Sequence, residues 1–165
     1  MMFRVMLRGL VCSLCLSASA SPEVDPPQPV QWKASLVPGA PVKSGTRAAI
    51  DLSGEVQQGW HVYALTQPAG GPIPLRISLD ENDVAQIRGT TSGTDPIRIN
   101  DSSFQMETQL YRGDFTLHVP VEVKNPAAGK QVIPLNIRFQ ACSDRTCLPP
   151  KTVHLSVPVE IFPGA

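Results

Sequence analysis

The chain has 165 residues, the size of one domain. Its 14 basic and 14 acidic residues balance, and no basic patch is visible, so the composition argues against a nucleic-acid-binding protein. After the first 20 residues, no stretch approaches the ~20 apolar residues of a membrane-spanning helix, so we expect no stable membrane insertion of the mature chain.

Residues 1–20 have the pattern of a secretory signal peptide. Arg4 and Arg8 give a positive start, a short apolar run follows, and the small residues 18–20 offer a cleavage site. We therefore predict export to the periplasm, with cleavage near Ala20 and Ser21. The alternative is that the segment is retained as an N-terminal anchor.

Cleavage changes the cysteine count. Of the 4 cysteines, Cys12 and Cys15 leave with the signal peptide, so the mature chain keeps Cys142 and Cys147. Two cysteines close together in an exported chain can form a disulfide, because the compartment permits it.

The mature sequence begins with a leader and continues in strand-like patterns. Residues 21–30, SPEVDPPQPV, are rich in proline and predict a short flexible leader. Apolar and polar residues then alternate, which is typical of half-buried antiparallel strands. Weaker strand patterns cover residues 31–37, 47–53, 60–65 and 74–79, and the clear ones cover 114–123, 132–139 and 151–161.

Seven or more short strands in roughly 135 residues, with no convincing helix, predict an all-β fold. The expected architecture is an immunoglobulin-like antiparallel β-sandwich that forms a single domain over residues 31–161. Pro120, Pro134 and Pro158 fall on the predicted outer face, which indicates edge strands or bulges.

Residues 80–111 interrupt the alternation. The segment is polar and long for a connection, and such segments are often functional loops. The alternative is a pair of short edge strands joined by ordinary turns.

The stretch FQACSDRTCLPP, residues 139–150, holds the cysteine pair. Cys142 ends one clear strand and Cys147 precedes the next, so we expect a hairpin in which the two lie within disulfide reach. Strict alternation places Cys142 on the outer, polar face with Arg138 and Gln140, although one bulge would reverse this. The pattern therefore predicts an accessible Cys142.

Three roles for the pair differ in their physical requirements. A disulfide that closes so short a loop contributes only about 2 kcal/mol as a structural link, and short exposed disulfides are readily reduced. A zinc or copper site lacks ligands, because His61, His118 and His154 are scattered and Met106 is the remaining methionine. We predict no metal and no cofactor, and the residues alone leave a redox pair and a small structural disulfide as rivals.

The cysteine hairpin and its trailing Leu-Pro-Pro resemble the active-site hairpin of the N-terminal periplasmic domain of the thiol:disulfide interchange protein DsbD, the disulfide bond corrector family. The stretches GWHVYALTQPAGGPIPLRISL and LYRGDFTLHVPVEV occur in the family's order and at suitable spacing, so the resemblance covers most of residues 30–161. It implies an immunoglobulin-like fold and a protein-disulfide reductase or thiol–disulfide carrier, in which Cys142 and Cys147 alternate between disulfide and dithiol.

The resemblance also implies neighbours and partners for the pair. Phe104 matches the aromatic shield of a cap loop, and His61 and Tyr63 match positions that flank the site. Cys147 is the sulfur expected to meet partners, by resemblance only. The implied partners are thioredoxin-like periplasmic proteins and a membrane-embedded thiol reductase.

Two features depart from the family's pattern. Its acidic residues beside the cap aromatic are replaced by Ser102 and Ser103, with Asp101 one position further away, which removes the support for a carboxylate next to the cysteines. Full-length members continue into membrane and thioredoxin-like domains, whereas this sequence stops at Ala165. The resemblance therefore implies a stand-alone carrier. The rival hypothesis is a non-catalytic immunoglobulin-like periplasmic binding module with a structural disulfide.

Overall fold

The computed structural model describes residues 27–39, 41–124 and 126–162. The predicted signal peptide, residues 1–20, and leader residues 21–26 lie outside this part. Within it no helix is long and apolar enough to cross a membrane. The regular elements are strands: β1 Val30–Val37, β2 Val42–Lys43, β3 Arg47–Val56, β4 Trp60–Tyr63, β5 Arg76–Leu79, β6 Ala85–Ile87, β7 Ser92–Gly93, β8 Ile97–Asp101, β9 Met106–Tyr111, β10 Asp114–Val123, β11 Gly129–Phe139, β12 Ala141–Ser143 and β13 Lys151–Phe162.

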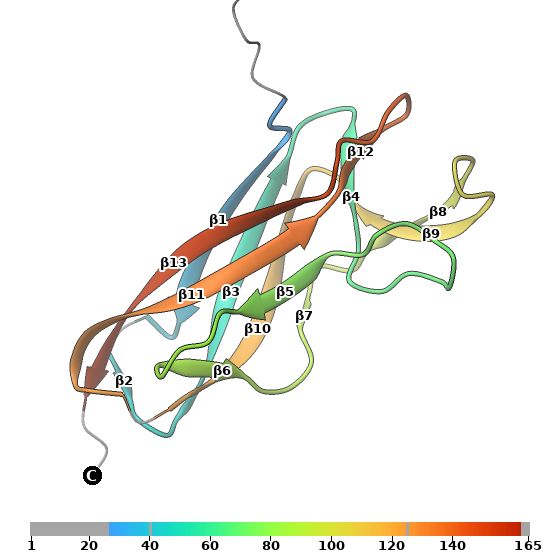
Figure 1. Ribbon diagram of the computed structural model, residues 1–165. Helices are drawn as coiled ribbons and strands as arrows, with labels where there is room; N and C mark the ends of the chain where they lie inside the picture. The colour runs from blue at the N-terminus through green and yellow to red at the C-terminus, as the bar shows by residue number, and fades with distance from the viewer. Residues whose placement is uncertain (1–26, 40, 125, 163–165) are drawn as a thin grey trace, which may run out of the picture.

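The strands form three sheets (Figure 1). The first has the order β1-β3-β10-β6, with β7 also paired to β10, and the second has the order β2-β13-β11-β5. These two pack on one another, and the third, β12-β4-β9-β8, lies at one end, where the β8–β9 hairpin projects to the side (Figure 1). Neighbouring strands are antiparallel except β2 and β13. The predicted all-β, immunoglobulin-like sandwich is confirmed.

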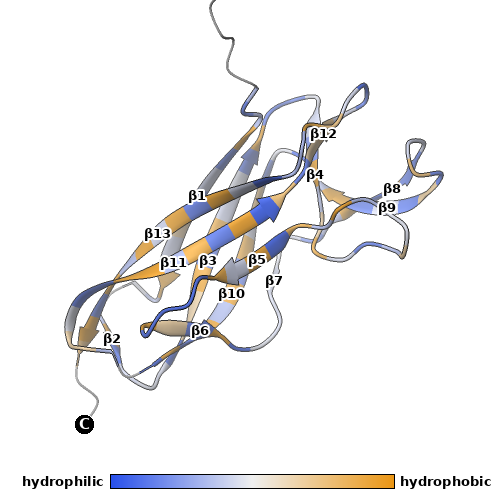
Figure 2. Cartoon of the chain, in the orientation of Figure 1, coloured by the Kyte–Doolittle hydropathy of each residue, from blue (hydrophilic) through white to orange (hydrophobic). Residues whose placement is uncertain are grey.

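The core follows from the alternation of the longest strands. Along β10 every second side chain is buried against the opposite sheet, and along β11 and β13 hydrophobic and hydrophilic residues alternate in the same way (Figure 2). Each fully buried aliphatic or aromatic side chain contributes about 1.5–3 kcal/mol. In β10 the buried residues are Phe115, Leu117, Val119, Val121 and Val123.

The three strand prolines do not mark edge strands, so that half of the prediction of edge strands or bulges was wrong. β10, β11 and β13 each have neighbours on both sides. The prolines instead lie at gaps in the pairing: Pro120 falls between the segments paired to β7 and β6, and β5 and β2 stop short of Pro134 and Pro158. A residue without an N–H removes no ladder hydrogen bond at such a gap.

Residues 80–111 combine both expectations. They contain the short strands β6 to β9, and the turn at residues 102–105 joins β8 to β9. This turn, called the cap turn below, stands beside β4 and β12 because β9 pairs with β4. The alternative of short strands joined by turns therefore describes the segment, and one of its turns reaches the cysteine hairpin.

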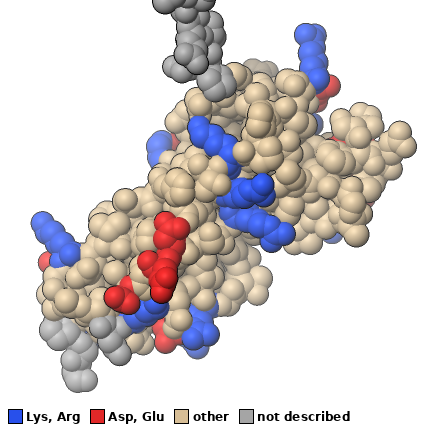
Figure 3. Space-filling model, viewed as in Figure 1, with Lys and Arg blue, Asp and Glu red and all other residues tan. Residues whose placement is uncertain are grey.

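Charged residues are dispersed over the surface. On the face shown in Figure 3, basic and acidic side chains stand in small groups, several with both signs side by side, and wide uncharged areas lie between the groups. The ion pairs Lys33–Glu55, Arg88–Glu122 and Arg98–Glu107 are exposed, and pairs of this kind contribute at most about 1 kcal/mol each. The fold depends on apolar packing more than on surface charge.

A cluster of four aromatic rings connects the sandwich to the third sheet. Tyr111 at the end of β9 stacks on Phe115, with ring centroids 4.2 Å apart. Trp32 packs edge-on against both Phe115 and Phe139, at 5.6 and 5.2 Å. Because Phe139 ends β11 immediately before the cysteine hairpin, this cluster supports the base of the hairpin.

Gly54 gives this cluster its space, so we expect Gly54→Ala to destabilise the fold. An added Cβ would lie 2.5 Å from the Phe115 ring and 3.1 Å from Trp32, and overpacking of this kind costs about 1–3 kcal/mol. Urea unfolding measures the loss. The control is Gly39→Ala, where an added Cβ meets nothing within 4 Å and the change should stay within about 0.5 kcal/mol. Equal effects of the two substitutions would contradict the prediction.

Candidate functional site

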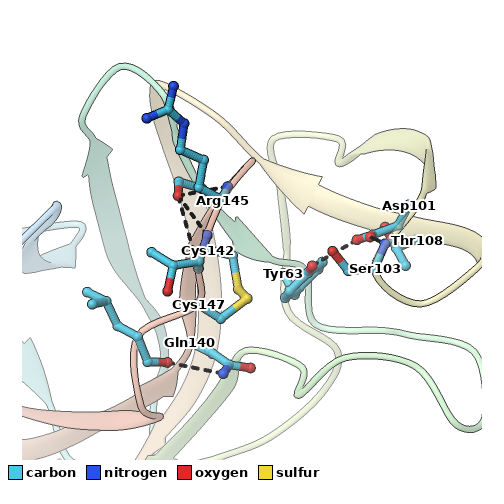
Figure 4. Close-up of a disulfide and its surroundings, with 11 residues drawn as sticks. Tyr63, Asp101, Ser103, Thr108, Gln140, Cys142, Arg145 and Cys147 are labelled. Carbon is cyan, nitrogen blue, oxygen red and sulfur yellow. Dashed lines mark hydrogen bonds between the residues drawn. A yellow bond between two sulfur atoms is a disulfide. The ribbon is translucent and has the colours of Figure 1, made fainter.

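Cys142 and Cys147 form a disulfide at the tip of the β12 hairpin (Figure 4). The two residues face each other as an antiparallel bridge. Backbone hydrogen bonds close the hairpin on both sides of them, from Ser143 N to Thr146 O at 2.8 Å and from Leu148 N to Ala141 O at 2.9 Å. The predicted hairpin is therefore present, and its four-residue tip places the sulfurs within bonding distance.

The two cysteines differ sharply in exposure. Cys142 is only 1% exposed, whereas Cys147 is exposed. The sequence prediction that Cys142 lies on the accessible face was wrong. The alternation itself continues, because Phe139 and Ala141 belong to the main core whereas Cys142 belongs to the separate small cluster. Cys142 therefore keeps the parity of Arg138, but in β12 this face is covered by the cap turn, whose Phe104 packs against the cluster that contains Cys142.

His61 and Tyr63 form the floor beside the disulfide. Both lie on β4, which pairs with β12 so that His61 is opposite Cys142. Both side chains are buried, and their ring centroids lie 5.0 Å apart in an edge-on arrangement. The structure thus brings both predicted flanking residues to the disulfide.

Phe104 lies on the cap turn above this floor. Its ring is half-buried and packs edge-on against Tyr63, with centroids 5.8 Å apart. Phe104 and Ile99 pack against a small buried cluster of Tyr63, Leu110 and Cys142, separate from the main core. The predicted cap aromatic therefore covers the same cluster that contains the buried cysteine.

Asp101, at the end of β8, holds the cap turn to the floor (Figure 4). Tyr63 Oη donates to its Oδ2 at 2.8 Å and Thr108 Oγ1 donates to the same oxygen at 3.3 Å. Ser103 N donates to Oδ1 at 2.9 Å. Burial acts to raise the pKa of Asp101, but the hydrogen bonds from Tyr63, the turn N–H groups and Thr108 outweigh it and lower that pKa.

No role for Asp101 was predicted from the sequence, where only its distance from the cap aromatic was noted. In the structure its carboxylate accepts a hydrogen bond from Tyr63 of the floor, 38 positions away in the sequence. A sequence signal does exist, since a single Asp before a polar turn can accept hydrogen bonds from the turn's own N–H groups. That signal predicts the bond to Ser103 but not the bond to Tyr63.

Burial and the neighbouring charges favour the neutral forms of the two floor residues, His61 and Tyr63. Burial lowers the pKa of His61, the positive charge of Arg112 lowers it further, and Asp101 and Asp144 oppose the shift. Burial, with the hydrogen bond and negative charge of Asp101, raises the pKa of Tyr63. His61 is therefore a neutral imidazole and Tyr63 a neutral phenol at neutral pH.

Arg145 lies at the hairpin tip between the cysteines. Its side chain is exposed and extends away from the disulfide (Figure 4). The hairpin contact of this residue is instead its backbone N–H, which donates to Ser143 Oγ at 3.3 Å. The arrangement is that of a solvated side chain on a hairpin tip.

An open hollow of about 210 Å³ lies between the hairpin and the cap turn. It is lined in part by His61, Tyr63, Asp101, Ser103 and Cys147. Within the described ranges, no three His, Cys, Asp or Glu side chains gather as a metal site would require. The chemistry that these groups can support is thiol–disulfide exchange at the exposed sulfur of Cys147.

Comparison with known proteins is consistent with this chemistry. Residues 30–158 match the family described as "Thiol:disulfide interchange protein DsbD, N-terminal". No curated protein sequence matches the chain.

Three solved structures are similar to this chain at low identity. The reduced N-terminal domain of DsbD from Neisseria meningitidis has 14% identity and a TM-score of 0.47, with 68% of this chain and 78% of that chain covered. The N-terminal periplasmic domain of ScsB from Proteus mirabilis has 18% identity and a TM-score of 0.47, covering 79% and 45%. BcpA, the major pilin subunit of Bacillus cereus, has 11% identity and a TM-score of 0.47, covering 80% and 40%.

We expect Asp101→Asn to lower the free energy of unfolding by about 2 kcal/mol at neutral pH, because hydrogen bonds to a buried charged group are lost or weakened. The folded-state pKa of Asp101 is lowered. Its contribution is therefore complete above the unfolded pKa of about 3.9 and is lost as the pH falls through the folded pKa.

Urea unfolding of the wild type and the variant at several pH values checks this. The difference between them should shrink below about pH 4. Asp83→Asn, at an exposed position, is the control and should change stability little at any pH. A wild-type-like stability of Asp101→Asn at neutral pH would rule out the anchoring role.

Proposed function

We propose a thiol–disulfide exchange function for this chain, which belongs to the family of the N-terminal domain of the thiol:disulfide interchange protein DsbD. The Cys142–Cys147 pair would carry reducing equivalents from a membrane-embedded thiol reductase or a thioredoxin-like donor to oxidised client proteins. The proposal includes a periplasmic location after removal of residues 1–20. The observation that carries it is a disulfide between one exposed and one buried cysteine, with an aromatic cap over the buried one.

The energetics of the disulfide favour exchange over a structural role. A disulfide restricts the unfolded chain less as the loop that it closes becomes shorter, and the sequence separation here is only 5. The sandwich already buries a large apolar cluster drawn from both main sheets, so it does not depend on this link. Exposure of Cys147 also makes one sulfur open to attack.

Reduction begins at Cys147. A partner thiolate attacks Cys147 Sγ, the Cys142–Cys147 bond breaks, and Cys142 leaves as a thiolate that takes up a proton. A second partner thiol then attacks the partner's own sulfur in the mixed disulfide and releases Cys147. Two electrons have passed to the domain, and the partner has become a disulfide.

Delivery of the electrons reverses these roles. The Cys147 thiolate attacks a client disulfide and forms a mixed disulfide, and one client thiolate leaves. Cys142 then attacks Cys147 Sγ, which restores the intramolecular disulfide and releases the second client thiolate. Cys147 is thus the residue that meets partners, and Cys142 is the residue that resolves the mixed disulfide.

Phe104 controls access to the pair in this proposal. Its packing on Tyr63 and the Cys142 cluster shields Cys142 while no partner is bound, whereas Cys147 stays exposed. A partner that docks on Cys147 displaces the cap turn. The cost of opening is modest, because the cluster beneath Phe104 has few members compared with the main core.

The rival function is a binding module in which the disulfide is inert. The reduction potential separates the two. A potential below about −300 mV, together with negligible exchange with a thioredoxin-like protein, is the property of a structural disulfide and would refute the exchange function.

Trapping distinguishes the two cysteines. Cys142→Ala should accumulate a mixed disulfide between Cys147 and a thioredoxin-like partner, because the resolving thiol is absent. Cys147→Ala should accumulate much less, because the remaining Cys142 is 1% exposed. Non-reducing electrophoresis and mass spectrometry measure both adducts. An equal yield from the two variants would contradict the assignment.

Phe104→Ala should raise the rate at which dithiothreitol reduces the disulfide by roughly tenfold, the factor that corresponds to about 1.4 kcal/mol of lost cap packing. Loss of the protein's disulfide under pseudo-first-order conditions gives the rate. Ile97→Ala is the matched control, because Ile97 lies on the same hairpin but is exposed. A rate unchanged by Phe104→Ala would mean that the ring does not limit access.

A further inference from the structure

His61 carries a polar atom that the packing leaves without a partner. The residue is 6% exposed, and its Nε2 is buried with no hydrogen-bond partner among the described residues. Buried side-chain nitrogen and oxygen atoms are nearly always hydrogen-bonded in native proteins, so an exception requires a physical explanation. The surroundings of the ring supply one.

The ring stands next to the buried cysteine. His61 and Cys142 are direct partners in the antiparallel ladder of β4 and β12, and the Cβ atoms of such partners lie about 4.5–5.5 Å apart on one face of the sheet. Cys142 is joined in turn to Cys147. The three residues therefore form a row across neighbouring strands, and His61 also borders the hollow that Cys147 lines.

The oxidation state of the pair decides whether the imidazole can find a partner. In the disulfide neither sulfur carries a proton, so neither can donate to His61. Reduction gives Cys142 an S–H group, which is a donor. The imidazole nitrogen next to Cys142 therefore has no sulfur-bound proton to accept in the disulfide state. In the dithiol state the S–H group of Cys142 supplies one.

The chemistry of resolution needs such a base. Thiol–disulfide exchange proceeds through the thiolate, but Cys142 is enclosed by Tyr63, Leu110 and the half-buried Phe104, and apolar surroundings disfavour the charged form. Water reaches this sulfur poorly because Cys142 is almost fully buried. A neighbouring neutral imidazole can accept the proton in its place.

We propose that His61 is the general base that takes the thiol proton of Cys142 when Cys142 resolves the mixed disulfide between Cys147 and a client. The inference rests on the proposed exchange function and adds a catalytic residue to it. The proton passes from Cys142 Sγ to the imidazole, and the thiolate attacks Cys147 Sγ. The bond between Cys147 and the client breaks, and the client sulfur leaves with the electron pair and then takes the proton from the imidazolium.

The groups that face His61 favour this role. Burial lowers its pKa, and Arg112, immediately after β9, lowers it further, while Asp101 on β8 and Asp144 at the hairpin tip act in the opposite direction. Tyr63, on the same strand, is a neutral neighbour whose hydroxyl is committed to Asp101. The imidazole is therefore neutral, and able to accept a proton, at neutral pH.

A two-phase reaction of the reduced domain tests the inference without a protein partner. Dithiobis(nitrobenzoate) reacts with Cys147 and releases one coloured thiolate, and attack by Cys142 then releases the second. The rate of the second phase is therefore the rate at which Cys142 resolves the mixed disulfide. Cys142→Ala should abolish the second phase and keep the first, which would assign the second phase to attack by Cys142.

His61→Gln should slow the second phase by about 100-fold at neutral pH, the low end of what a general base contributes, and leave the first phase unchanged. In the wild type the second-phase rate should rise through the His61 ionisation, below the ordinary histidine pKa of about 6.5, and then level off. In His61→Gln it should keep rising toward the ordinary thiol pKa of about 8.5. His154→Gln, at an exposed histidine on β13, should match the wild type.

His61→Phe keeps a flat ring beside Tyr63 and separates catalysis from packing. If His61 acts as a base, the second phase of His61→Phe should be as slow as that of His61→Gln. If His61 only packs against Tyr63, the second phase of His61→Phe should have the wild-type rate. A second phase that retains the wild-type rate and pH profile in either His61 variant that folds would overturn the inference. Absence of the first phase in the wild type would instead contradict the proposed function itself.

Discussion

The transfer of the chain from the second sheet to the third at Gln140 is the constraint on which the site depends. β11 follows the second sheet as far as Phe139, and β12 then pairs with β4 in the third sheet. Successive residues of a regular strand point to opposite faces, so Cys142 faces away from the main core, as Arg138 does, and is buried because the third sheet brings Phe104 of the cap turn over that face. The side chain of Gln140 stabilises the transfer, since its Nε2 donates to Leu148 O at 3.1 Å across the hairpin.

The cover over Cys142 also explains why the sequence predicted the fold better than the site. Strands β10, β11 and β13 follow from their period-two patterns because burial of one face enforces that period. The exposure of Cys142 was predicted wrongly, since the parity of β11 does place its side chain on the outer face but does not show that the cap turn, distant in sequence, covers that face. His61, Tyr63 and Phe104 were reached through family resemblance, because their proximity depends on strand register that the sequence pattern does not contain.

Floor and cap differ in how firmly they are held. β4 connects to the main core through Val62 and Ala64, which belong to the large apolar cluster. The cap turn rests on a much smaller cluster and on the carboxylate of Asp101. A segment with few apolar contacts opens at lower free energy than the core. The arrangement gives a fixed floor under the disulfide and a cover whose attachment is polar and local.

The unequal exposure of the two sulfurs has a consequence for oxidative damage. Peroxide reaches Cys147 of the reduced pair more readily than Cys142, so a sulfenic acid forms first at the exposed residue. The neighbouring Cys142 thiol can condense with it, which expels water and regenerates the disulfide before further, irreversible oxidation. The unequal exposure that offers one point of attack in the proposed function therefore also returns an accidental oxidation product to the disulfide.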